Sequence, residues 1–355
     1  MAGLGTLGTG ALVLAVVCGT TGCSTLGYYG QAVGGHLDLL QRTRPVSEVL
    51  ADPATPERLR QRLALSQQMR DFAVQELKLP DNRSYRSYAD LERPSVVWNV
   101  VAAPELSLRL KTWCFPVMGC VGYRGTFRRE PADALAAELR AQGWEVAVYG
   151  VPAYSTLGWT NWLGGDPLLN TFIHWPEGEL ARILFHELAH QVVYVNDDTM
   201  FNESFATAVE QIGSQRWLAT RASEAARREY ADLQARRRDF RELTLRHRQR
   251  LQALYESPQT DDAKRQGKAA LQAQLREEVE RLKAGPWAGF TGYDRWFAEA
   301  NNASFGVQAA YNELVPAFER LFQREGRDFE RFYAAVRRLA ALPRDERRAT
   351  LAALN

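Results

Sequence analysis

The 355-residue sequence has little cysteine, no excess of one charge and no long hydrophobic run. Its four cysteines are too few for a scaffold built on disulfide bonds. Its 44 basic and 42 acidic side chains give a net charge of +2, so charge does not indicate nucleic-acid binding. Apolar residues make up 46% and charged residues 24%, which is typical of a folded globular protein and excludes a disordered chain or a multi-span membrane protein. A chain of this length forms one large domain or two ordinary ones.

The first 23 residues contain no charged side chain and carry the pattern of an export signal. The apolar run from Ala11 to Cys18 is far shorter than the roughly 20 residues that span a bilayer, which indicates a signal-peptide core and no transmembrane helix. Thr20-Thr21-Gly22-Cys23 resembles the lipobox of bacterial lipoproteins, which implies a signal peptide over residues 1–22 and a lipid on Cys23. Ser24, where an inner-membrane retention signal has Asp, favours the outer membrane with the body facing the periplasm. The alternative is a flexible leader with no sorting role.

Hydrophobic periodicity divides the rest of the chain into helical and strand-forming parts. Residues 34–79 repeat apolar side chains every three or four positions, as helices do. Short β-branched and aromatic runs between Pro94 and Phe127, and the alternating segment from Trp144 to Tyr149, predict strands, with a helix at 131–142 between them. The expected fold class is α+β, with a small β-sheet and a large helical C-terminal part.

Three regions are expected after the signal peptide. Residues 23–217 would hold the N-terminal helices and the sheet, residues 218–285 a long Arg-rich helical hairpin, and residues 286–355 a C-terminal helical region packed on the first. Acidic residues are interleaved with the arginines at 236–238 and 246–250, and few aromatic residues accompany them. This pattern favours a solvated helix surface over a surface for phosphates or membrane headgroups.

Cys114 and Cys120 flank a turn at residues 115–119 that contains Pro and Gly and can bring the two thiols within disulfide reach. An oxidising periplasm would allow that bond to form. A metal pair would need further thiol or imidazole ligands, which the flanking residues do not supply. Two free buried thiols are the remaining alternative.

The segment His186-Glu187-Leu188-Ala189-His190 lies in a predicted buried helix. Pro176 opens this helix, Glu177 and Glu179 lie in its first turn, and apolar residues surround the motif. The two histidines are one turn apart, so both imidazoles can reach one Zn²⁺ at about 2.0–2.1 Å. Burying these polar groups without a partner would be costly, and a bound metal removes that cost.

A second helix is expected to begin after the turn-forming residues 196–199 and to fold back beside the first. It would present Glu203 as the third ligand and leave the fourth position to water, the open arrangement of catalytic zinc. Glu210, two turns later, is the alternative ligand. Glu187 would be the general base, which takes a proton from the activated water and passes it to the leaving amine of a peptide.

The zinc motif together with Asn202-Glu203-Ser204-Phe205-Ala206 resembles the site of gluzincin aminopeptidases, in which an Asn-Glu-Gly-Phe-Ala segment donates the glutamate ligand. This resemblance implies a thermolysin-like zincin core within residues 23–217 and favours Glu203 over Glu210. The chain from Cys23 to near its end also resembles a family of bacterial lipoproteins named putative aminopeptidases. The segments that carry this second likeness are Tyr28–Ala32, Leu79–Asn82, Trp98–Glu105, Trp113–Cys120, Ala153–Leu157, Asp166–Leu169, the zinc motif and Asn301–Ala303.

The Met-Glu-Asn motif that holds a substrate's amino terminus in gluzincin aminopeptidases is absent upstream of His186. Glu105 is a candidate anchor for an α-ammonium group instead, and Tyr154 or Tyr311 is a candidate to stabilise the oxyanion. Residues 153–157, with Ala153 and Ser155, form a candidate edge strand for an extended peptide. A structural role is the alternative for each of these residues.

The motifs together predict a zinc-dependent peptidase, by resemblance an aminopeptidase, that acts on peptides and is held at the membrane by its lipid anchor. One alternative is a zinc endopeptidase or oligopeptidase with the same site. Another is a non-enzymatic envelope scaffold that keeps zinc for folding and binds a partner through the Arg-rich hairpin. No nucleic-acid partner is expected, and the sequence makes no prediction of the oligomeric state.

Overall fold

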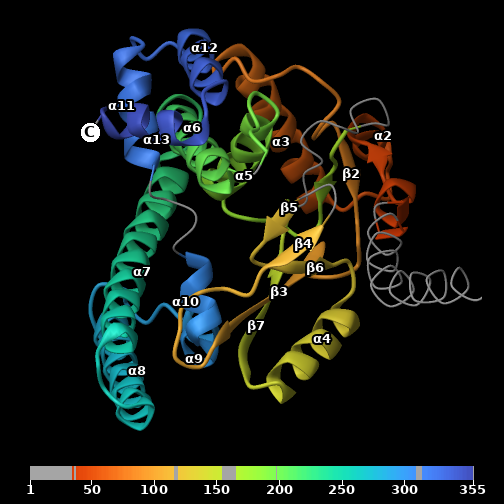
Figure 1. Cartoon of the computed structure of the whole chain (residues 1–355). Helices are drawn as coiled ribbons and strands as arrows, with labels where there is room; N and C mark the ends of the chain where they lie inside the picture. Colours follow the sequence, from red (N-terminus) through yellow and green to blue (C-terminus); the bar gives the residue numbers. More distant parts are fainter. Residues whose placement is uncertain are drawn as a thin grey trace, which may run out of the picture.

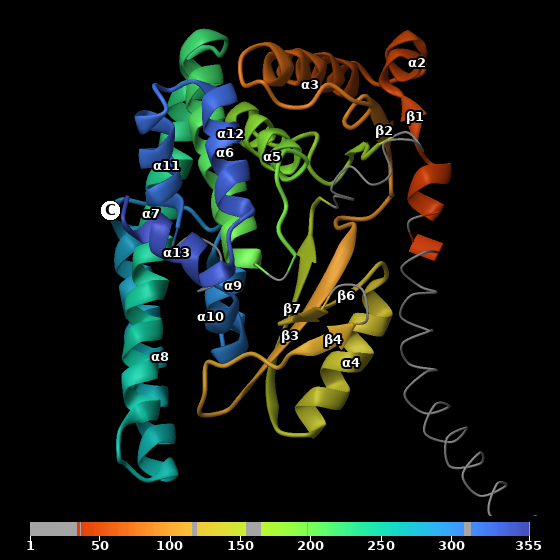
Figure 2. The same cartoon turned by 45° about the horizontal axis from the view of Figure 1, so that its top comes forward.

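The computed structural model describes residues 34, 35, 37–115, 119–153, 165–196, 198–308 and 314–354. The predicted signal peptide and Cys23 lie outside these residues, as do Tyr154, Ser155 and Tyr311. The chain has a mixed α+β fold, mostly helical with small sheets (Figures 1 and 2). Within the described ranges, none of the helices combines the length and the apolar character that crossing a bilayer requires.

The described residues form three small β-sheets. Their strands are β1 (Arg44–Pro45), β2 (Ser87–Ala89), β3 (Val97–Pro104), β4 (Trp113–Phe115), β5 (Gly119–Val121), β6 (Arg124–Thr126), β7 (Trp144–Val151) and β8 (Leu168–Leu169). The largest sheet is antiparallel with the order β6-β3-β7, and the other two have the orders β1-β2-β8 and β4-β5. Strand β3 pairs with β7 along its whole length, from Val97 opposite Val151 to Pro104 opposite Trp144.

The helices make up most of the described chain and carry most of its core. They are α2 (Val46–Ala51), α3 (Glu57–Gln75), α4 (Arg129–Ala141), α5 (Glu177–His190), α6 (Thr199–Thr220), α7 (Glu224–Glu256), α8 (Asp261–Ala284), α9 (Asp294–Glu299), α10 (Asn302–Gln308), α11 (Val315–Arg324), α12 (Phe329–Ala340) and α13 (Arg344–Ala352). As predicted, Pro176 immediately precedes α5. Ser257 and Pro258 lie in the break between α7 and α8.

Strand β3 is buried on both faces. Its side chains alternate, so Val100 and Ala102 pack beneath α4 while Val101 and Ala103 face α10. This burial explains why residues 100–103 of β3 are a continuous apolar run and not an alternating one.

Helices α5 and α6 pack against each other within the main hydrophobic core (Figure 1). Helix α3 packs on both, and α11 packs on α6. Aromatic contacts join these layers: the rings of Phe72 and Trp217 meet edge to face at 5.2 Å, and those of Phe201 and Phe318 lie 5.2 Å apart. Because this core is closely packed, polar groups on the facing turns of α5 and α6 are held in defined positions.

Helices α7 and α8 form a long pair that extends away from this core beside α9 and α10 (Figure 2). Its inner side is a second hydrophobic cluster that includes Leu251, Leu275, Trp287 and Phe305. The N-terminal part of α7 returns to the main core, where it packs on α5 and α6.

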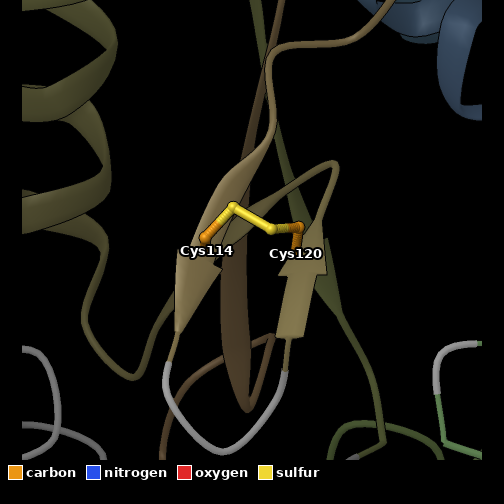
Figure 3. Close-up of a disulfide and its surroundings, with 2 residues drawn as sticks. All are labelled: Cys114 and Cys120. Atoms are coloured by element: carbon orange, nitrogen blue, oxygen red, sulfur yellow. A yellow bond between two sulfur atoms is a disulfide. The ribbon is translucent and has the colours of Figure 1, made fainter.

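A disulfide bond joins Cys114 and Cys120 across the β4-β5 hairpin (Figure 3). The two cysteines are directly opposite each other in the register of this two-stranded sheet. A hairpin this short has few ladder hydrogen bonds, so the cross-link limits the fraying of its strands.

Candidate metal centre

His186 and His190 lie on one face of the last turn of α5. Their Nε2 atoms are 3.1 Å apart, and their ring planes are nearly perpendicular. Both rings are held by the buried helix, in which Phe185, Leu188 and Ala189 are fully buried. Two imidazole nitrogens at this distance can share either a proton or a metal ion.

Glu203 of α6 approaches the same point. Its Oε2 atom lies 3.4 Å from Nε2 of His186, and its Oε1 atom lies 3.8 Å from Nε2 of His190. Ligands at 2.0–2.1 Å around a tetrahedral zinc ion are separated from one another by about 3.3–3.4 Å. Among the described residues, His186, His190 and Glu203 form a group that could hold a metal ion. One ligand atom from each of them lies within 4.8 Å of those of the other two.

The side chain of Asn202 fixes the turn that brings Glu203 to the histidines. Its Oδ1 atom accepts a hydrogen bond from the backbone N–H of Val195 at 2.8 Å, and its Nδ2 atom donates to the carbonyl of the same residue at 2.7 Å. Asp198 caps α6 by accepting from the N–H of Phe201, and it forms ion pairs with Arg347 and Arg348 of α13. Position 203 is therefore set by a local polar clamp and by the C-terminal helix.

Two of the three residues, His190 and Glu203, are already in the protonation state that a metal ligand needs. Burial, followed by the neighbouring charge of His186, lowers the pKa of His190 to about 4, so this imidazole is neutral near pH 7. Burial alone would raise the pKa of Glu203, but hydrogen bonding to His186 and the charges of both imidazoles hold it below its ordinary value. Burial likewise opposes a charge on His186, yet Glu203 and Glu210 raise its pKa well above the ordinary value. A cation bound among these groups would displace the additional proton that the raised pKa places on His186.

Glu210 contacts the opposite side of His186. Its Oε2 atom is 2.9 Å from Nδ1 of His186, and its Oε1 atom accepts from Arg182 at 2.7 Å. A carboxylate in this position keeps the proton on Nδ1 and leaves Nε2 free to bind a metal. The structure therefore brings Glu203, and not the alternative Glu210, to the point shared by the histidines.

Glu187 lines a cavity of about 310 Å³ that His186 and Glu203 also line. Burial raises the pKa of Glu187 to about 7, and the charges of Glu203, Asp166 and Glu210 add to this effect while His186 opposes it. A carboxyl group with a pKa near neutrality is well matched to proton transfer at physiological pH.

The other residues predicted for substrate binding are placed as follows. Glu105 follows the end of β3, where its carboxylate pairs with Arg265 of α8 at 3.0 Å and its carbonyl accepts from Asn302. Glu105 is not among the described residues that line the cavity, and its role as an ammonium anchor stays a prediction. Ala153 is half-buried beyond the end of β7, next to Pro152, which does line the cavity. The roles of Tyr154, Ser155 and Tyr311 stay predictions as well.

Charged residues that the sequence reasoning missed lie beside the histidines. Arg182 donates to Glu179 and Glu210, and Arg237 of α7 also contacts Glu179, at 2.6 Å. The solvated surface predicted for the arginines at 236–238 is therefore wrong for Arg237, whose side chain is one-quarter exposed. One signal was available: Arg182 is a charged residue about one helical turn before His186, within the mostly apolar segment 180–185.

Comparison with known proteins identifies the relatives of this chain. No curated protein and no solved structure matches it. Residues 27–351, which are most of the chain, match the protein family described as "Putative aminopeptidase". The chain therefore belongs to this family.

Proposed function

We propose that this protein is a zinc-dependent peptidase, specifically an aminopeptidase, that hydrolyses peptide bonds with Glu187 as general base. The observation that carries the proposal is the convergence of His186, His190 and Glu203 beside a cavity that Glu187 also lines. The family to which the chain belongs supports a peptidase. A carboxylate next to the first histidine also has no purpose in a closed structural zinc site.

The chemistry of the donor atoms favours zinc. Two imidazoles and one carboxylate are the ligand set of many catalytic zinc sites, whereas calcium and magnesium prefer oxygen ligands alone. Zinc, when bound, would polarise the peptide carbonyl and make water more acidic. The arrangement of the two histidines on α5 and the glutamate on the adjacent α6 supports a core of the thermolysin-like zincin type.

Glu187 carries the proton through the proposed reaction. Its carboxylate takes a proton from the attacking water as the oxygen bonds to the carbonyl carbon. It then gives the proton to the amine nitrogen as the C–N bond breaks, so one water is consumed and one acid and one amine are released. Glu210 keeps the His186 ring oriented throughout.

The proposed location is the outer membrane, with a lipid on Cys23 and the catalytic body facing the periplasm. This part of the proposal is supported by the uncharged leader and its Thr-Thr-Gly-Cys ending. Metabolic labelling with a fatty-acid analogue tests it, because a Cys23→Ala variant should lose the label.

The catalytic role of Glu187 is tested by Glu187→Gln, which removes the base but keeps the shape of the side chain. We expect kcat on peptide substrates to fall at least 100-fold, because this is about what a general base contributes to the rate. The melting temperature and the zinc content should be retained. Glu224→Gln, which neutralises an exposed glutamate on α7, is the matched control and should keep full activity. Undiminished hydrolysis by Glu187→Gln would refute the mechanism.

Aminopeptidase specificity is tested separately with the wild-type protein. Acetylation of the amino terminus should stop cleavage of a peptide that is hydrolysed when this terminus is free. Equal cleavage of the two peptides would instead indicate an endopeptidase with the same metal site.

A further inference from the structure

The cavity beside the metal centre has a strongly basic wall. His186, Glu187 and Glu203 line one part of it, and Arg182, Arg237 and Arg241 line another. Arg182 lies on α5, whereas Arg237 and Arg241 are one turn apart on α7, which packs against α5. Two helices thus bring three guanidinium groups to the edge of the proposed reaction site.

Two buried carboxylates pair with two of these three guanidiniums. Arg182 binds Glu179 and Glu210, and Arg237 binds Glu179. Both carboxylates are almost fully buried and already engaged, Glu210 with His186 as well. Among the described residues, neither carboxylate forms an ion pair with the third guanidinium, that of Arg241.

Arg241 is the arginine of this wall that lies outside those ion pairs. In the described part of the chain its guanidinium forms no hydrogen bond and no ion pair, although its side chain is half-buried. Burial, followed by the charges of Arg237 and Arg182, lowers the pKa of Arg241, so its surroundings disfavour the cation. Arg237 also has a buried terminal nitrogen, Nη1, to which no described residue forms a hydrogen bond. An unpaired cation among like charges is an unfavourable arrangement unless an anion binds there.

We propose that Arg241, reinforced by Arg237 and Arg182, binds a carboxylate of the peptide substrate and so makes this protein selective for peptides that carry a negative charge near the cleaved bond. This inference rests on the proposed peptidase function and extends it to a substrate class. The carboxylate has two possible sources, the free C-terminus of a very short peptide or an acidic side chain.

Arg182, which shares α5 with His186, gives a scale for the separation between this wall and the histidines. Arg182 precedes His186 by four residues on α5, which corresponds to about 6 Å along the helix axis. Consecutive Cα atoms of a peptide are 3.8 Å apart, so the distance corresponds to about one or two residues. The cavity of about 310 Å³ is also at the small end for ligand sites, which suits a short peptide.

The test compares zinc-loaded wild type with Arg241→Gln on two pairs of peptides. The first pair is trialanine and trialanine amide, which differ in the C-terminal charge. The second pair is a tripeptide amide with Glu or Gln at its second position, which differs in side-chain charge. Arg228→Gln is the matched control, because Arg228 is an exposed arginine of the same helix whose ion-pair partner among the described residues is Glu224. The readouts are kcat/KM and, in a Glu187→Gln background, the dissociation constant from calorimetry.

Wild type should prefer the charged member of at least one pair by about 10- to 100-fold, the value of a hydrogen bond to a charged group. Arg241→Gln should reduce this preference to nearly one, and Arg228→Gln should keep it. The pair that shows the effect identifies the source of the carboxylate. Equal cleavage within both pairs, or a preference that survives in Arg241→Gln, overturns the inference but leaves the peptidase proposal standing. Failure to cleave or bind any of the four peptides overturns both.

Discussion

His247 on α7 and His190 on α5 are both almost fully buried, with 2% and 6% of their surface exposed. Burial lowers the pKa of each to about 4, so both rings are neutral near pH 7. Their neighbours differ: His247 packs on Phe305 at 4.7 Å between ring centroids, whereas His190 faces His186 and Glu203. Burial and neutrality alone therefore do not make a metal site. A second imidazole and a carboxylate must converge on the same point.

The largest difference between the two regions should appear in metal affinity. His190→Ala removes one of three ligands and should weaken zinc binding by more than about 100-fold, because loss of an outer-shell partner alone costs 10- to 100-fold. His247→Ala also deletes a buried imidazole but should leave zinc affinity unchanged. Competition with a fluorescent chelator measures both, and equal losses in the two variants would contradict the comparison.

A smaller effect is expected when the ligands are kept and their support is removed. Glu210→Gln leaves all three ligand side chains in place but removes the charge beside Nδ1 of His186. We expect a 10- to 100-fold loss of zinc affinity, about the value of such partners. The same titration measures it. Affinity equal to that of wild type would mean that Glu210 serves only to neutralise Arg182.

The clamp before Glu203 should contribute to folding as well as to the site. Asn202→Ala removes both side-chain hydrogen bonds to the backbone of the half-buried Val195. The free energy of unfolding should fall by about 1–3 kcal/mol, and zinc should restore less stability than it gives wild type. Urea denaturation with and without zinc measures both quantities. A variant as stable as wild type would show that the turn is held by other contacts.

The smallest expected effect is a change in the pH dependence of stability when His247, which lies outside the site, is replaced. Because the folded-state pKa of His247 is about 4 and the ordinary value is 6.5, the unfolded chain binds the proton more readily. Its contribution to stability is complete above pH 6.5 and declines as the pH falls toward 4. Between pH 7 and pH 5, His247→Leu should lose about 1 kcal/mol less stability than wild type. Identical pH dependence of urea unfolding in the two proteins would contradict this assignment.

Local patterns were sufficient to predict the helix that carries the histidines. Pro176, the acidic first turn and the i, i+4 histidines are all contained in 15 residues, and the helix forms where they indicate. Mixed α+β content could also be predicted, because apolar periodicity changes clearly between residues 34–79 and the strands that follow. Predicting the group of His186, His190 and Glu203 required one long-range assumption, namely that α6 folds back on α5.

The remaining parts of the site depend on contacts that no short pattern encodes. Glu203 and Glu210 are two turns apart on one face of α6, so periodicity cannot tell which of them reaches Nε2 and which reaches Nδ1 of His186. Arg237 and Arg241 come from a helix that begins beyond α6, and they face inward while Arg238 is exposed. The composition of α7 predicts a solvated helix. Which of its arginines reach the cavity is determined by the packing of α7 on α5, which composition does not reveal.

The most direct test of the metal centre is anomalous diffraction at the zinc edge from crystals grown with Zn²⁺. One strong peak is expected at about 2.0–2.1 Å from Nε2 of His186, Nε2 of His190 and a carboxylate oxygen of Glu203, with a fourth position open to water. A peak bound by other residues, or a zinc ion with Glu203 turned away from it, would contradict the account.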